Sequence, residues 1–187
     1  MTDRRKLTLS ALLAAGLGGA CVAPPADARP AIAATAGYRW HRVAGGGGMS
    51  LDYRIDGRTL HCRLRAPTHG WLALGFNRPG AGIVGANLLM FRVSAGGLAY
   101  GEDQHVVGLG DHRRDRDIGG RDHIDKLRGK RSGDITTVSF SYPLVTGDRR
   151  DLALRRGQRV ELVLAYSVSD DFSHHSRSRT HHVVTLR

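Results

Sequence analysis

The sequence is poor in the features that mark many enzymes and disulfide-linked proteins. Its 187 residues include two cysteines, Cys21 and Cys62, and Cys21 falls inside a predicted export signal, so the remaining chain lacks the pair that an internal disulfide needs. No GxSxG or HExxH motif occurs, which removes the usual sequence support for a serine hydrolase or a zinc protease. No long stretch has the 3.6-residue periodicity of an amphipathic helix. We therefore predict an all-β, non-catalytic protein in which Cys62 is a small buried strand residue.

The start of the chain has the order of a secretory signal. The basic residues Arg4, Arg5 and Lys6 precede an apolar run over residues 7–22, and small residues lead to a cleavage site after Ala28. The apolar run is shorter than the about 20 residues that a transmembrane helix needs. We therefore expect a periplasmic or secreted protein that is not an integral membrane protein.

This signal divides the chain into three parts. Residues 1–28 form the predicted signal peptide, residues 29–37 a linker, and residues 38–187 a single domain of ordinary size. The arginine pair in the signal is also similar to a twin-arginine export signal, and the segment ending at Cys21 is similar to a lipobox. A lipid anchor at Cys21 is therefore the alternative to simple cleavage.

The charge balance is strongly basic. The chain has 28 Lys and Arg against 17 Asp and Glu, a formal net charge of +11, which favours an acidic redox partner, an anionic surface or an acidic small ligand. The basic residues are scattered through predicted turns, and no basic helical stripe or aromatic RNA-binding motif occurs, so nucleic acid is not an expected partner.

Short β-rich runs separated by Gly, Asp and Asn predict strands from Tyr38 onward. Their spacing is typical of an Ig-like antiparallel sandwich of two sheets. The segment 108–131 is charged and has no periodicity, and we predict a long loop there. The expected strands are Tyr38–Ala44, Met49–Ile55, Thr59–Ala66, Gly70–Phe76, Ala86–Val93, Leu98–His105, Ile135–Tyr142, Arg159–Ser167 and His182–Leu186.

Apolar patterning predicts the core of this sandwich. Apolar and polar residues alternate in the run TTVSFSYP, which predicts one buried face, whereas ANLLMFRV and VELVLAYS are almost continuously apolar, as in strands covered on both faces. The residues predicted to be buried are Leu72, Leu74, Phe76, Leu89, Val138, Phe140, Leu162, Leu164 and Tyr166.

Four stretches in order resemble the DOMON family. They are GWLALGFN at 70–77, GIVGANLLMFRV at 82–93, TTVSFSYPLVTGDRRDLAL at 136–154 and LAYSVSDDFSHHSRSRT at 164–180. The resemblance implies an Ig-like β-sandwich that holds a b-type haem or a sugar.

The resemblance also implies a set of haem-binding residues. Haem-binding members hold the iron between a methionine and a histidine; the histidine corresponds to His175, whereas Ile83 stands at the methionine position. A second axial ligand would then be Met90, His112 or another histidine, or the iron would be five-coordinate. Arg177 and the nearby Arg179 are positively charged, and this charge alone, apart from the resemblance, suits an ion pair with haem propionates. The resemblance further implies a pocket at one end of the sandwich, with His175, Arg177 and the Ile83 segment within reach of one another.

Three functions follow from these expectations. The first is an exported module that binds b-type haem for electron transfer to an exported redox partner. The alternative is a module that binds a carbohydrate or another small ligand without redox chemistry. The third is metal binding by the histidine cluster at His174, His175, His181 and His182, although the neighbours His181 and His182 should face opposite sides of a strand. The neighbouring Asp170 and Asp171 are expected to cap a turn.

Overall fold

The computed structural model describes residues 39–187, and strands make up most of this part of the chain. Four predictions lie outside the described residues: the signal peptide, its cleavage site after Ala28, the linker over residues 29–37 and the alternative lipid anchor at Cys21. Within the described residues, no helix has the length and apolar character needed to cross a membrane. The elements are β1 His41–Ala44, η1 Gly46–Gly48, β2 Ser50–Asp56, β3 Thr59–Ala66, β4 Leu72–Asn77, β5 Asn87–Val93, β6 Ala99–Gly108, β7 Asp111–Arg114, η2 Asp115–Ile118, β8 Asp125–Ser132, β9 Ile135–Pro143, β10 Arg159–Tyr166 and β11 Ser178–Thr185.

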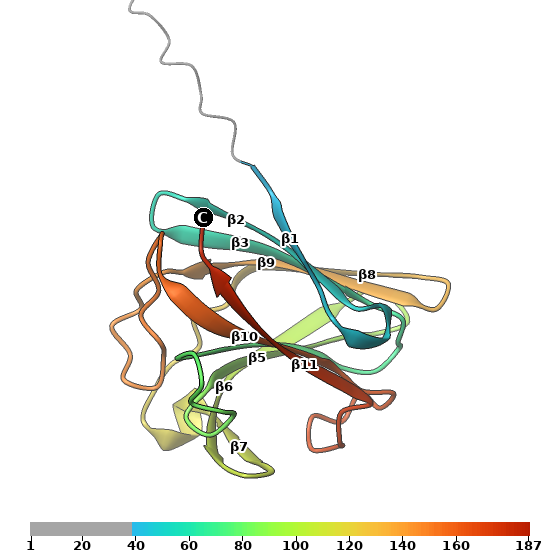
Figure 1. The fold of residues 1–187 in the computed structure, drawn as a ribbon. Coiled ribbons are helices and arrows are strands. Elements are labelled where there is room, and N and C mark those ends of the chain that lie inside the picture. The colour runs from blue at the N-terminus through green and yellow to red at the C-terminus, as the bar shows by residue number, and fades with distance from the viewer. Residues whose placement is uncertain (1–38) are drawn as a thin grey trace, which may run out of the picture. The chain divides into compact units, whose positions relative to one another are not determined.

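The strands form two sheets that face each other (Figure 1). One sheet has the order β1-β2-β3-β9-β8, and the other has the order β11-β10-β4-β5-β6-β7. Every pair of neighbouring strands is antiparallel. The predicted all-β sandwich is therefore confirmed.

The core lies between the sheets and follows the alternation of the strands. On β9, for example, Val138, Phe140 and Tyr142 are all buried and belong to the main apolar cluster. Phe140 lies against Phe91 of the opposite sheet, with 4.5 Å between their ring centroids. All nine residues predicted to be buried are buried, and Cys62 is a free thiol in the same core.

The two nearly continuous apolar strands, β5 and β10, are buried on both faces. Their inward residues, such as Leu89 and Leu164, join the main core. Their outward residues, including Met90 and Ala165, belong to a second apolar cluster on the outer face of the six-stranded sheet, against which Ile83 and Phe172 pack. The pattern that predicted two covered faces is confirmed, and the second face is where a pocket lies.

The prediction of one long loop over residues 108–131 is wrong. This segment contains β7, the turn η2 and most of β8. Both strands lie at an edge of their sheet, where exposed charged side chains are common because they discourage pairing with other chains. In β8, written DKLRGKRS, four of the five charged residues are exposed, and the strand lacks the apolar alternation by which strands are recognised in sequence.

Candidate cofactor pocket

A pocket of about 140 Å³ opens on the outer face of the six-stranded sheet. This volume is smaller than the about 300 to 1,000 Å³ of typical small-molecule and cofactor sites, so a haem would also extend over the open side of the pocket. Its apolar wall comes from outward-facing residues of the central strands. The side chains of Ala73 and Ala165 are small, and the space that they leave unfilled forms the hollow. The full lining consists of Trp71, Ala73, Ile83, Leu88, Met90, Val106, Gly110, Asp111, His112, Val163, Ala165, Ser173, His174, His175, Ser176 and Arg179.

Four of the five residues predicted from sequence line this pocket: Ile83, Met90, His112 and His175. The fifth, Arg177, does not. Strand β11 starts at Ser178, four residues earlier than predicted, and its first pair is Tyr166 with Ser178, so Arg177 lies beyond the end of the sheet. Arg179 instead pairs with Ala165 in the pocket wall. The expected location at one end of the sandwich is also wrong, because the outward residues of the sheet form the pocket.

His112 is held by a chain of polar side chains on the rim of the pocket. Its Nδ1 contacts Oε1 of Gln104, and Nε2 of Gln104 donates to Oε2 of Glu102. Because an amide oxygen only accepts, Nδ1 of His112 carries the proton and Nε2 keeps its lone pair. Burial lowers the pKa of His112, which favours the neutral ring. The imidazole is therefore oriented in the form that binds metals.

The loop that carries His175 is fixed by hydrogen bonds to the end of β10 and to Trp71. The Oγ of Ser167 donates to the His175 carbonyl at 2.9 Å, and Nε1 of Trp71 donates to the His174 carbonyl at 3.1 Å. The His174 ring is itself engaged, with Nδ1 3.0 Å from the Ser167 hydroxyl oxygen. These contacts hold the backbone on both sides of the His175 ring.

Two further side chains shape the loops at this pocket. Asn77 donates from Nδ2 to the Gly82 carbonyl at 2.8 Å, which fixes the segment that carries Ile83. Asp171 accepts from the backbone and the hydroxyl of Ser173, both at 2.9 Å, and these bonds lower the pKa of Asp171. The expectation that an aspartate here caps a turn is confirmed for Asp171.

A family model for the DOMON domain matches residues 45–167. The chain belongs to the DOMON family. Among solved structures, it is similar to the cytochrome domain of Myriococcum thermophilum cellobiose dehydrogenase, with a TM-score of 0.61 and 10% sequence identity over 79% of this chain and 83% of that chain. It is also similar to the cytochrome b domain of pyranose dehydrogenase from Coprinopsis cinerea, with a TM-score of 0.51 and 10% identity over 77% and 81% of the two chains.

At this level of identity, the two likenesses show that the DOMON domain shares their fold. A search of curated proteins gives no match. What the pocket holds must therefore be argued from its own residues.

The donors in the pocket of this DOMON domain suit a haem. Imidazole nitrogens and a thioether sulfur are the side-chain ligands that b-type and c-type haem iron takes, and His112, His175 and Met90 supply both kinds within one apolar hollow. Ile83 is half-buried in the same wall and has no lone pair to offer. The residues present thus fit the cofactor without a methionine at position 83.

Within residues 39–187, the four histidines of the C-terminal cluster do not come together as one group of potential metal ligands. His181 faces Glu161, with Nδ1 2.7 Å from Oε1, and hydrogen bonds from His181 and the Gly80 backbone lower the pKa of Glu161. His182 faces the other side of the strand and contacts Thr180. Among residues 39–187, neither histidine belongs to a group of three or more potential metal ligands.

Glu102 and Gln104, the two residues that position His112, were not predicted from the sequence. They lie on the same face of β6 as Val106, which pairs with His112 of β7, and this pairing could not be found because residues 108–131 were predicted to be a loop. The sequence analysis also missed an acidic cluster on the opposite face of β6, which belongs to a separate site.

Proposed function

We propose that this DOMON domain is an exported b-type haem protein, which exchanges electrons with an exported redox partner and catalyses no reaction by itself. The observation that supports it is the meeting of His112, His175 and Met90 around one apolar hollow. When bound, haem supplies one-electron chemistry. The protein supplies the ligands, the apolar surroundings and the charges that tune it.

We propose that His175 and His112 would hold the iron. The sequence resemblance implies His175 as a ligand, and its loop is tied to β10 through Ser167. His112 has its Nδ1 engaged by Gln104, and such a partner fixes the ring of a metal-binding histidine and raises its basicity. Met90 is 1% exposed on the central strand β5, where its side chain serves as apolar wall.

Charge around the pocket gives the cofactor an orientation. Arg179 lines the pocket and is exposed, so its guanidinium is available to a haem propionate. The wall from the central strands is apolar and would exclude water from the cofactor, whereas the lining also includes the polar residues Asp111, Ser173, His174 and Ser176. The net charge of +11 favours an acidic redox partner, and the signal-like first 28 residues support a meeting outside the cytoplasm.

An absorption spectrum tests this function. Protein purified from haem-replete cells, or mixed with haemin, should show a Soret band and the sharp visible bands of a reduced low-spin b-type haem. His175→Ala should lose the low-spin spectrum, and so should His112→Ala, whereas Met90→Leu should keep it. Loss in Met90→Leu with retention in His112→Ala would move the second ligand to Met90. A wild-type protein that never takes up haem would refute the proposal.

One observation favours a second function. Ile83 replaces a methionine that haem-binding relatives use, and an apolar residue there suits a pocket that holds a carbohydrate or another small ligand without redox chemistry. This function takes the place of the first if haemin does not bind. The test is a thermal-unfolding screen with a panel of sugars and apolar ligands. A ligand of the pocket should raise the melting temperature of the wild type and leave that of a variant with a filled pocket unchanged.

A further inference from the structure

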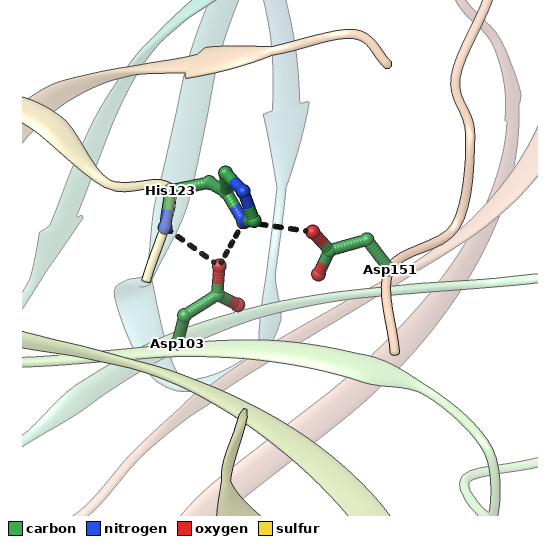
Figure 2. Close-up of side chains that lie close together, drawn as sticks. All are labelled: Asp103, His123 and Asp151. Atoms are coloured by element: carbon green, nitrogen blue, oxygen red, sulfur yellow. Dashed lines mark hydrogen bonds and ion pairs between the residues drawn. The ribbon is translucent and has the colours of Figure 1, made fainter. Parts of the chain in front are cut away.

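A cluster of acidic side chains lies on the inner face of β6, away from the haem pocket (Figure 2). Asp103 of β6 and Asp151 of the β9–β10 connection both point toward His123, which precedes β8. Nδ1 of His123 is 3.0 Å from Oδ2 of Asp151 and 3.7 Å from Oδ2 of Asp103. Nδ2 of Asn87 donates to both carboxylates, at 2.9 Å to Asp103 and 2.8 Å to Asp151. The amide of Asn87 thus lies inside the cluster.

Asp151 is shared with a second group of three carboxylates. Asp115, Asp148 and Asp151 each offer an oxygen, and these oxygens all lie within 4.8 Å of one another. Asp148 is held by the backbone amides of Arg121 at 2.7 Å and Arg150 at 2.9 Å. Asp115 is 0% exposed, and neither of its carboxylate oxygens has a hydrogen-bond partner. A buried carboxylate with no partner is unfavourable unless it takes up a proton or a positive charge is supplied.

Other buried polar atoms in the cluster are also without hydrogen bonds. Among residues 39–187, eight buried side-chain nitrogen and oxygen atoms make no hydrogen bond, and six of them lie here. Two of the six, His123 Nδ1 and Asp151 Oδ2, face each other at 3.0 Å as an ion pair. Asn87 and Tyr142, which are 1% and 0% exposed, supply two of the other four. Folded proteins leave few buried polar groups unpaired, so four at one place require an explanation. The four are Asn87 Oδ1, Asp115 Oδ1 and Oδ2, and Tyr142 Oη.

The cluster holds more carboxyl groups than basic groups. Four carboxyl groups, with Asp103 and Asp115 fully buried, face His123 and Arg150, and the Arg150 guanidinium donates to the Ile118 carbonyl. Burial and the neighbouring carboxylates raise the pKa of Asp103 to about 8 and that of Asp115 to about 7. These two carboxyls therefore hold their protons more firmly than an exposed aspartate does, and a bound cation would favour their ionised form.

We propose that this cluster binds a divalent cation of the oxygen-preferring class, calcium above all, held by Asp115, Asp148 and Asp151. Asp103 lies beside this group, since it shares His123 with Asp151, and carboxylate oxygens thus far outnumber the single imidazole nitrogen. Calcium takes 6 to 8 oxygen ligands in irregular geometry, whereas zinc prefers nitrogen and sulfur. The cation would supply the charge and the partners that the buried oxygens lack. The proposal is independent of haem.

Binding of the metal itself is the first test. Full-length protein is treated with EDTA, freed of chelator, and titrated with CaCl₂ by calorimetry and by thermal unfolding. At calcium concentrations a hundred times Kd, the melting temperature should rise by about 5 to 10 °C. If EDTA-treated protein binds neither Ca²⁺, Mg²⁺ nor Mn²⁺ and melts at the same temperature with and without them, the proposal is wrong. Tight binding of Zn²⁺ with no binding of Ca²⁺ would overturn the assignment of the cation class.

Two variants locate the cation. Asp115→Asn should weaken calcium binding by at least about tenfold, while melting at a higher temperature than wild type in EDTA, because it removes a buried, unpaired carboxylate. Asp117→Asn is the matched control, since Asp117 lies in the same turn η2, is 58% exposed and pairs with Arg114. The control should bind calcium like the wild type. Unchanged calcium binding in Asp115→Asn would overturn the site, and the wild-type titration decides the proposal even if this variant does not fold.

Discussion

The candidate haem pocket and the acidic cluster lie on opposite faces of the same sheet and differ in how complete they are. Around the pocket, three polar groups have partners: His112 contacts Gln104, the His174 ring contacts Ser167, and the Trp71 indole donates to a carbonyl. In the acidic cluster, by contrast, both carboxylate oxygens of Asp115 are buried and unpaired. The pocket is therefore built to stand without its ligand, whereas the cluster depends on one. Removal of haem should leave the fold intact, and removal of the cation should weaken it.

Filling the pocket should separate the two sites most sharply. Ala165 is 5% exposed and lines the pocket, so Ala165→Leu would place three more carbon atoms in the space for the cofactor. We expect haem binding to be abolished and the calcium-induced rise in melting temperature to be unchanged, as measured by haemin titration and thermal unfolding. Ala95→Leu, in the exposed turn before β6, is the control. Haem binding that survives in Ala165→Leu would mean that the cofactor lies elsewhere.

The cluster should make the metal-free protein less stable as pH rises. Asp103 and Asp115 have folded pKa values of about 8 and about 7, above the ordinary 3.8. A carboxyl with a raised pKa holds its proton more firmly in the folded state, so its contribution to stability is full below about pH 4 and is lost as pH rises through about 7 and 8. The melting temperature in EDTA should include this decline.

The decline with pH can be checked against a variant and against calcium. Asp148, Asp151, His123 and Arg150 also face the cluster, so the comparison must be made within one series of buffers. The melting temperature of Asp115→Asn in EDTA should fall less between pH 5 and pH 8 than that of the wild type, and saturating calcium should reverse the wild-type trend. Parallel curves for wild type and variant would contradict a buried, ionising carboxyl at position 115.

Disrupting the support of His112 should have a smaller effect than filling the pocket. Gln104→Leu removes the acceptor for Nδ1 of His112, and loss of such a partner typically lowers affinity by about 10 to 100-fold. We expect weaker haem binding, measured by haemin titration, with the fold retained. Gln104→Glu keeps an acceptor oxygen and should retain haem, with a lower reduction potential because the ligand becomes more basic. Equal haem affinity in Gln104→Leu and wild type would remove His112 from the axial pair.

The smallest effect is expected at the pocket rim. Arg179→Ala should weaken haem binding by about fivefold, since an exposed ion pair contributes about 1 kcal/mol or less, and the difference should shrink at high salt. Arg177→Ala is the natural control, because Arg177 is exposed and does not line the pocket. Equal losses in both variants would indicate a general effect of surface charge.

The sequence predicted the sandwich and its core because one buried face imposes alternation on most strands. It did not predict β7 and β8, whose charged residues suit a sheet edge and leave no apolar alternation. The pocket residues Ile83, Met90, His112 and His175 could be chosen from the family resemblance and the scarcity of other ligands. Arg177 and Arg179 were both predicted to suit haem propionates, and only Arg179 lines the pocket, because β11 starts four residues earlier than predicted.

The acidic cluster could not be predicted in the same way. Its members come from β6, η2 and the β9–β10 connection, and each aspartate by itself is typical of a turn or a solvated surface. Only Asp103 carried a local signal, because it pairs with the core residue Leu89 and so faces inward on its strand. A charged residue at an inward position of a strand is rare enough to draw notice.

The alternation of β6 ties the two sites to one register. Glu102 and Gln104 pair with Met90 and Leu88 and face outward, while Asp103 pairs with Leu89 and faces inward. If β6 slipped by one residue against β5, its two faces would be exchanged: Asp103 would face the pocket and Gln104 would face the core. The pocket and the acidic cluster have no side chain in common, but both depend on this one register of β5 and β6. A ligand that locks this alignment at either face preserves the geometry that the other face requires.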